Sequence, residues 1–222
     1  MTKHLVHDEP VVVWTGSAML SGRLLEPSEA SALLLVASAN GTATHAGYNA
    51  VANHLTHHGF AVLEADLLTE DEAEFDSRTG HYRCNIPMLS TRLIGVADWA
   101  VREKHLRNLP IAILTSGPVA AAALNVAARQ PGKFDALILA DARTDLVEDI
   151  LPNVKAPTLL IAPDSDLAIL RMNREAEELL RYTKRLEVLP ESTHVFADSA
   201  HTEAIAGLAL SWAAAYAQPV YA

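Results

Sequence analysis

The sequence lacks several features that mark specialised classes of protein. It contains a single cysteine, Cys84, so no disulfide can form within the chain, and a reducing environment is the natural expectation. No apolar run approaches the roughly 18 residues of a membrane-spanning helix, and the first residues lack the apolar stretch of a signal peptide. We therefore expect a cytoplasmic protein with no membrane partner.

Positive charge is also scarce. Lysine and arginine number 17 against 27 aspartates and glutamates, which gives a formal net charge of −10. Such an acidic surface argues against binding to nucleic acid or to anionic membranes. The histidines His54, His57 and His58 share one segment, but no third ligand with suitable spacing accompanies them, so we expect neither a metal nor a cofactor. The expected partner is a small-molecule ligand or substrate, bound by a monomer or a homodimer.

What the chain does have is a regular alternation of strand-like and helix-like segments over its 222 residues, which fit one domain spanning 1–222. This alternation predicts an α/β fold with a mostly parallel sheet covered by helices on both faces. The polar, acidic stretch 69–82 is expected to be an irregular, solvated loop. The strands are expected at 11–14, 22–25, 33–36, 60–66, 111–114, 136–140, 158–161 and 185–189, and the helices at 47–58, 88–105, 118–130, 167–182 and 201–216.

The most informative segment is 111–129, an apolar strand that turns directly into a helix. A strand, a sharp turn and a helix form the frame of a nucleophile elbow, whose usual sequence is Gly-x-Ser-x-Gly. Here the central position is Gly117, and the flanking positions are Thr115 and Val119. Two further candidate catalytic residues, Asp166 and His194, follow the ends of later strands, where sites in parallel sheets lie.

Several motifs, in this order and spacing, resemble those of the α/β-hydrolase fold and, more narrowly, of small dienelactone-hydrolase-like proteins. The resemblance covers about residues 10–216. It implies a serine or cysteine that attacks an ester carbonyl, a histidine (His194) that transfers the proton, and an aspartate (Asp166) that orients the histidine. The stretches that resemble the family are 66–69, 78–83, 109–111, 151–161 and 192–196.

The chain departs from this family at two points. The nucleophile position is Gly117, followed by Pro118, which suits the first position of a helix. The loop that often begins with His-Gly in the family reads Ser38-Ala39-Asn40-Gly41. These departures predict that serine-ester hydrolysis is lost or very weak, and that the protein binds a small molecule or uses a His194–Asp166 dyad.

Two other interpretations stay open. In the first, Ser116 is the nucleophile of an active esterase or lactonase, although adjacent side chains near a strand end point to opposite sides. In the second, the chain is a non-enzymatic sensor or partner protein.

The remaining candidates lie around the expected pocket. Asn40, Gly41, Pro118 and His45 are expected to form the oxyanion region or to line the pocket. Arg83 and Arg92 are candidates for binding an anion, with an ordinary ion pair as the alternative for each. Cys84 is expected to be inert, because no base accompanies it in the sequence.

Overall fold

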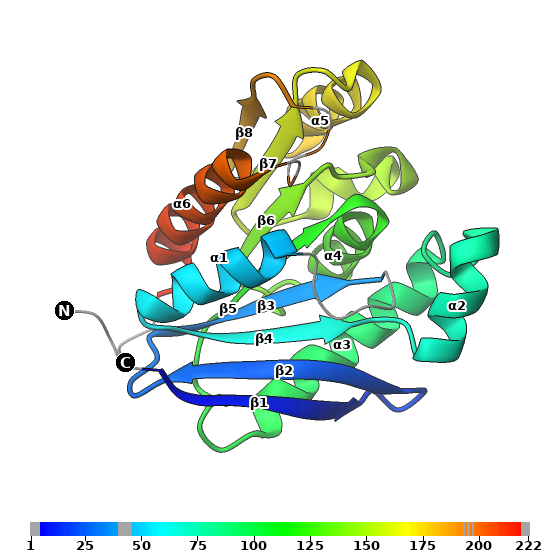
Figure 1. The fold of residues 1–222 in the computed structure, drawn as a ribbon. Coiled ribbons are helices and arrows are strands. Elements are labelled where there is room, and N and C mark those ends of the chain that lie inside the picture. Colours follow the sequence, from blue (N-terminus) through cyan, green and yellow to red (C-terminus); the bar gives the residue numbers. More distant parts are fainter. Residues whose placement is uncertain (1–4, 40–45, 193, 195, 197, 219–222) are drawn as a thin grey trace.

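The computed structural model describes residues 5–39, 46–192, 194, 196 and 198–218 (Figure 1). In this part of the chain, eight strands form one sheet in the order β1-β2-β4-β3-β5-β6-β7-β8. The pairs β1·β2 and β2·β4 are antiparallel, and all other neighbours are parallel. The sheet is therefore mostly parallel, as the sequence predicted. The strands are β1 (Leu5–Trp14), β2 (Met19–Pro27), β3 (Ala32–Ser38), β4 (Phe60–Asp66), β5 (Ile111–Ser116), β6 (Ala136–Ala140), β7 (Thr158–Pro163) and β8 (Lys184–Leu189).

Helices cover both faces of the sheet (Figure 1). One face packs against α1 (Ala46–His57) and α6 (Ser199–Tyr216). The other face packs against α3 (Ile86–Arg102), α4 (Gly117–Arg129) and α5 (Leu167–Leu179). Two short 3₁₀ helices, η1 (Thr144–Leu146) and η2 (Glu148–Asn153), follow β6. None of the helices in the described ranges is both long and apolar enough to cross a membrane.

Small residues allow the helices on the second face to approach the sheet closely. Four successive alanines of α4, residues 120–123, are completely buried. On α3, a Cβ atom added at Gly95 would lie 2.6 Å from Cβ of Thr15, in the turn that follows β1. Small residues thus let both α3 and α4 pack closely against their neighbours.

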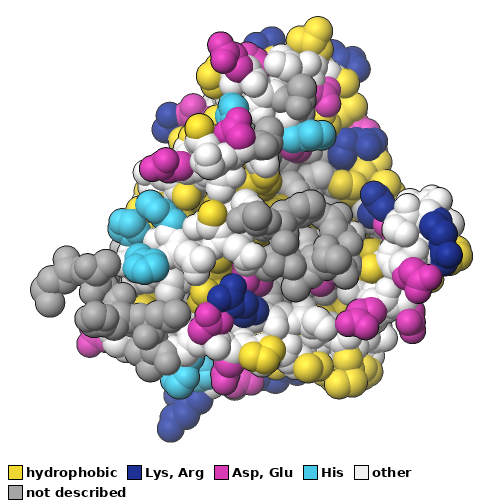
Figure 2. All heavy atoms as spheres, viewed as in Figure 1, with side chains coloured by type: hydrophobic (Ala, Val, Ile, Leu, Met, Phe, Trp, Pro, Cys, Tyr) yellow, Lys and Arg dark blue, Asp and Glu magenta, His cyan; other side chains and the backbone are white. Residues whose placement is uncertain are grey.

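The edge strand β1 and its neighbour β2 expose apolar side chains at the lower rim of the view in Figure 2. Val12, Trp14 and Met19 are all more than half exposed. These side chains share one face of the hairpin, where Trp14 pairs directly with Met19. The opposite side chains of the hairpin, among them Val13 and Leu20, are buried against α3 and its neighbours, so exposed and buried side chains alternate along the pair.

The prediction of an irregular loop at 69–82 is wrong, because residues 70–79 form the helix α2 (Glu70–Thr79). Thr69 and Glu72 form a capping box: the N–H of Thr69 donates to Oε2 of Glu72 at 2.9 Å, and the N–H of Glu72 donates to Oγ1 of Thr69 at 3.3 Å. Gly80, with φ of +64°, ends the helix. The acidic residues that suggested a solvated loop lie in the first helical turn, where the helix dipole favours negative charge.

Arg92 of α3 holds α2 in place. Its Nη1 and Nη2 atoms donate to the Glu72 carboxylate at 2.5 and 2.7 Å, and Nη1 also donates to the Leu67 carbonyl at 2.6 Å. The Arg92 side chain is buried and paired with Glu72. It therefore forms an ordinary ion pair, the alternative that was expected if Arg92 did not bind an anion. Arg92 therefore links α3 to α2.

The Glu72–Arg92 pair predicts a pH-dependent stability. The hydrogen bond from Arg92 lowers the pKa of Glu72 below its ordinary value of 4.5. The stabilisation is therefore complete above that value and is lost as the pH falls through the lower pKa of the folded state. We expect Glu72→Gln to reduce the free energy of unfolding by about 2 kcal/mol at pH 7. The difference from the wild type should shrink in acid, because glutamine and protonated glutamate are both neutral.

Urea denaturation at neutral and acidic pH measures this difference. Glu74→Gln is the control, since Glu74 lies on the same helix but is exposed and only 3.5 Å from an exposed Arg78. Its effect should stay within about 0.5 kcal/mol. A Glu72→Gln deficit that is the same at both pH values would contradict the role of the charge.

Candidate functional site

The carboxyl ends of four parallel strands surround a cavity of about 310 Å³, which we call the elbow pocket. Five residues predicted for the site line it together: Ser116, Gly117, Pro118, Asp166 and His194. Their catalytic or binding roles remain predictions. The other lining residues are Ser38, Ala39, Arg83, Val119, Asp141, Arg143 and Ile169.

Gly117 forms the turn between β5 and α4. Its φ is +56°, in the left-handed region, where a residue with a side chain is strained by about 1–3 kcal/mol and glycine is not. A Cβ atom added to Gly117 would meet no other atom within 4 Å. The turn thus has the sharp strand-to-helix shape of a nucleophile elbow, with open space where the attacking side chain of such an elbow would begin.

The hydroxyl of Ser116 is hydrogen-bonded to a tyrosine and not to an imidazole, the partner that a serine nucleophile needs. The phenol of Tyr48, on α1, donates a hydrogen bond to Ser116 Oγ at 2.7 Å. Tyr48 is buried, with its ring centroid 4.7 Å from that of Phe196, and burial raises the pKa of its phenol, so the group stays protonated as a donor. Within the described ranges, Ser116 and His194 make no hydrogen bond with each other.

Asp166 is engaged as the cap of a helix. Its Oδ1 atom accepts hydrogen bonds from the N–H groups of Ala168 and Ile169, each at 3.0 Å, in the first turn of α5. These groups have no partner within the helix, so an aspartate before the first turn satisfies them. Among the residues that the structure describes, Asp166 and His194 form neither an ion pair nor a hydrogen bond. The predicted dyad of these two residues therefore stays a prediction.

The carboxylate beside the imidazole is that of Asp141. Nδ1 of His194 lies 3.8 Å from Oδ2 of Asp141, and the His194 side chain is 78% exposed. Asp141 has φ of +47°, in the left-handed region, at a cost of about 1–3 kcal/mol for a residue with a side chain. Strained residues of this kind gather at functional sites. The sequence places Asp141 just after a strand, but it contains no sign of this backbone conformation.

The segment after β6 is tied to the elbow. The N–H of Asp141 donates to the Ile161 carbonyl at 2.9 Å, and the N–H of Arg143 donates to the Gly117 carbonyl at 3.2 Å. These backbone bonds hold Asp141 and Arg143 at the pocket wall.

Two arginines line the elbow pocket, and each forms an ion pair with an aspartate. Nε of Arg83 donates to Oδ2 of Asp76 at 2.6 Å, while Nε and Nη2 of Arg143 donate to the two carboxylate oxygens of Asp145, each at 2.8 Å. The hydrogen bonds from Arg143 lower the pKa of Asp145. The anion-binding role of Arg83 stays a prediction, and Arg143 is a pocket residue that the sequence interpretation missed. Cys84, next to Arg83, is an exposed free thiol.

Three predicted pocket residues, Asn40, Gly41 and His45, lie outside the described residues. Across the described part of the chain, no group of three or more histidine, cysteine, aspartate or glutamate side chains is arranged to hold a metal ion. His54 and His58 lie with their rings 4.5 Å apart on α1.

Comparison with known proteins gives the following relatives. A dienelactone hydrolase from Anabaena variabilis ATCC 29413 is 35% identical, with a TM-score of 0.91 over 97% of this chain and 100% of that one. The esterase domain of a Rhodothermus marinus protein is 17% identical, with a TM-score of 0.74 over 95% of this chain and 100% of that one, a likeness of fold alone. No family model matches the chain.

Two Mycobacterium tuberculosis proteins, from strains CDC 1551 / Oshkosh and ATCC 25618 / H37Rv, have the name "Putative phosphoribosyl transferase". Each is 33% identical over 208 residues, which make up 93% of this chain. The chain spans only 46% of the length of these relatives.

The backbone at the elbow predicts a specific cost for a side chain at this position. Gly117→Ala should reduce the free energy of unfolding by about 1–2 kcal/mol, because alanine resists the left-handed conformation even though space for its Cβ exists. Chemical denaturation measures the loss. Gly95→Ala is an informative comparison, since its Cβ would overlap Thr15, and we expect a larger loss there. A Gly117→Ala protein as stable as the wild type would show that the turn changes its conformation.

Proposed function

Because the chain belongs to the dienelactone-hydrolase-like family of the α/β-hydrolase fold, as its motifs predicted, we propose that it keeps the family's pocket without serine attack at the elbow. In this proposal, the elbow pocket binds a small molecule that bears a carboxylate. The observation behind the proposal is Gly117, a residue without a side chain at the left-handed turn that faces the pocket.

The lining of the elbow pocket supports a carboxylate ligand. Arginine N–H groups donate to carboxylates, and Arg83 and Arg143 both line the cavity. Among the described residues, their bonds to Asp76 and Asp145 use Nε and Nη2 and leave the Nη1 atom of each arginine to donate to a ligand. Val119 and Ile169 add apolar wall. The volume of about 310 Å³ lies at the lower end of the range for small-molecule sites, about 300–1,000 Å³, which favours a compact ligand.

A second candidate is hydrolysis without a covalent intermediate. The separation of 3.8 Å between Nδ1 of His194 and Oδ2 of Asp141 supports a dyad in which the imidazole accepts a proton from water as the water attacks a carbonyl carbon. General-base help of this kind contributes about 10²–10⁴-fold, so the turnover would be slow. The dyad of this proposal uses Asp141 in place of Asp166, because Asp166 caps α5.

The other interpretations have less support. The esterase that uses Ser116 would need the Ser116 hydroxyl beside an imidazole, whereas Tyr48 donates to that hydroxyl. The interpretation as a non-enzymatic sensor is compatible with ligand binding in the elbow pocket. It differs from hydrolysis by the dyad because it predicts no turnover. We do not extend the transferase name of the mycobacterial relatives to this chain, since it matches under half of their length.

Labelling with a fluorophosphonate tests the loss of serine attack. We expect no stoichiometric labelling of the wild-type protein, because Gly117 has no hydroxyl and the hydroxyl of Ser116 is bonded to Tyr48. Gly117→Ser should acquire the label, since its Cβ would enter open space beside the pocket residues, whereas Gly117→Ala should not. Mass spectrometry of the intact protein measures the adduct. Labelling of any serine in the wild-type protein would contradict the proposal. If Ser116→Ala abolishes that labelling, the result would support the Ser116 esterase.

Benzoate is a suitable probe for the carboxylate site. We expect Arg143→Gln to weaken benzoate binding about tenfold or more, because a charge-assisted hydrogen bond is lost. Titration followed by NMR gives the dissociation constants. Arg171→Gln is the matched control, since Arg171 is an exposed arginine of α5, 3.7 Å from Glu175. Equal binding by the wild type and Arg143→Gln would remove Arg143 from the site.

A further inference from the structure

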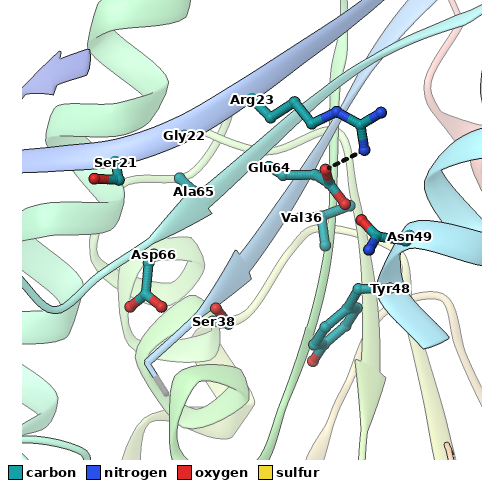
Figure 3. A pocket seen from close by; sticks show the side chains of 10 residues that line it. All are labelled: Ser21, Gly22, Arg23, Val36, Ser38, Tyr48, Asn49, Glu64, Ala65 and Asp66. Carbon is teal, nitrogen blue, oxygen red and sulfur yellow. Dashed lines mark hydrogen bonds and ion pairs between the residues drawn. The ribbon is translucent and has the colours of Figure 1, made fainter. Parts of the chain in front are cut away.

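A second cavity, of about 120 Å³, lies between the sheet and α1, and we call it the Glu64 pocket (Figure 3). Its walls come from β2, β3, β4 and the first turn of α1. Ser38 borders both this cavity and the elbow pocket. The described lining residues are Ser21, Gly22, Arg23, Val36, Ser38, Tyr48, Asn49, Glu64, Ala65 and Asp66.

Two buried acceptor atoms in this pocket receive no hydrogen bond from the residues that the structure describes. Glu64 is only 5% exposed, and none of these residues donates to its Oε1 atom. The same is true of Oδ1 of Asn49. Figure 3 shows these two side chains, one from β4 and one from α1, pointing toward each other. Buried polar atoms in native proteins are almost always paired, so these two acceptors are suited to a ligand that supplies N–H or O–H groups.

The charges of the pocket favour a cationic donor. Glu64 and Asp66 are both buried acidic residues of β4. Arg23 is the one cationic residue among the described lining residues, and its Nε and Nη2 atoms already donate to the carboxylate of Asp8 at 2.7 Å each. Its contact with Glu64 is long, 3.5 Å from Nη1 to Oε2. Arg23 therefore leaves the other oxygen of Glu64 without a donor.

We propose that the Glu64 pocket binds a small primary alkylammonium group, whose N–H groups donate to Oε1 of Glu64 and Oδ1 of Asn49. The alkyl part packs against Val36 and Ala65, which line the same cavity. A water molecule occupies about 30 Å³ in the liquid, so the pocket of about 120 Å³ has room for a group of up to about four heavy atoms. This site does not depend on the function proposed for the elbow pocket.

Ethylammonium is the probe that tests this site. At pH 8 and constant ionic strength, we expect ethylammonium chloride to raise the melting temperature of the full chain in a saturable manner. Sodium chloride and tetramethylammonium chloride should not do so, because neither cation has an N–H donor. Titration followed by NMR should place the largest shifts on residues of β4 and the first turn of α1.

Two variants connect the binding to the named acceptors. Glu64→Gln should weaken ethylammonium binding about tenfold or more, because the charge of its acceptor is removed. Asn49→Ala removes the second acceptor from a half-buried helical position and should also weaken binding, so the test survives if one variant fails to fold. Glu74→Gln, on exposed α2, is the control and should bind as the wild type does.

Three results would overturn the proposal. The first is an equal rise in melting temperature with sodium and with ethylammonium. The second is unchanged ethylammonium binding in both folded variants. The third is the absence of saturable binding by the wild type, which is expected if the Asn49 amide turns to donate to Glu64.

Discussion

The turn between β5 and α4 imposes the constraint on which the candidate site depends. β5 lies inside the sheet, bonded to β3 on one side and β6 on the other, and α4 begins at the residue that follows the strand. The chain can reverse so sharply only if one residue takes a left-handed conformation, and Gly117 does so without strain. The same turn places Pro118 and Val119 at the pocket and gathers the carboxyl ends of the neighbouring strands around it.

The geometry of this turn also explains why Ser116 does not take the place of the missing nucleophile. Ser116 shares the alternation of Ala112 and Leu114, which pack on the face covered by α1 and α6. Its hydroxyl consequently meets Tyr48 of α1. The chemistry that stays available at the elbow pocket comes from its two sides: the arginines Arg83 and Arg143, and the pair formed by His194 and Asp141.

Local patterns in the sequence predicted most of the fold. Continuous apolar runs identified the central strands, and the strand-turn-helix segment identified the position of Gly117. The sequence also contained the capping box of α2 at Thr69 and Glu72, but the acidic run concealed it. Pairings between distant residues were beyond such patterns: Arg92 with Glu72, or His194 with Asp141, depend on how elements pack. Asp166 shows a further difficulty, because a carboxylate after a strand can orient a histidine or begin a helix, and its position alone does not decide between them.

The alanines at 120–123 have a consequence for how this chain tolerates genetic change. Side chains that end at Cβ offer almost nothing to remove, so truncation at this layer costs little beyond glycine's effect on the helix. Any enlargement, by contrast, would press α4 against the sheet, α3 or η2, depending on the position, and overpacking of this kind typically costs about 1–3 kcal/mol. Substitutions at positions 120–123 are therefore confined to small residues. Position 117, by contrast, has room for a side chain, and only its left-handed backbone conformation disfavours one.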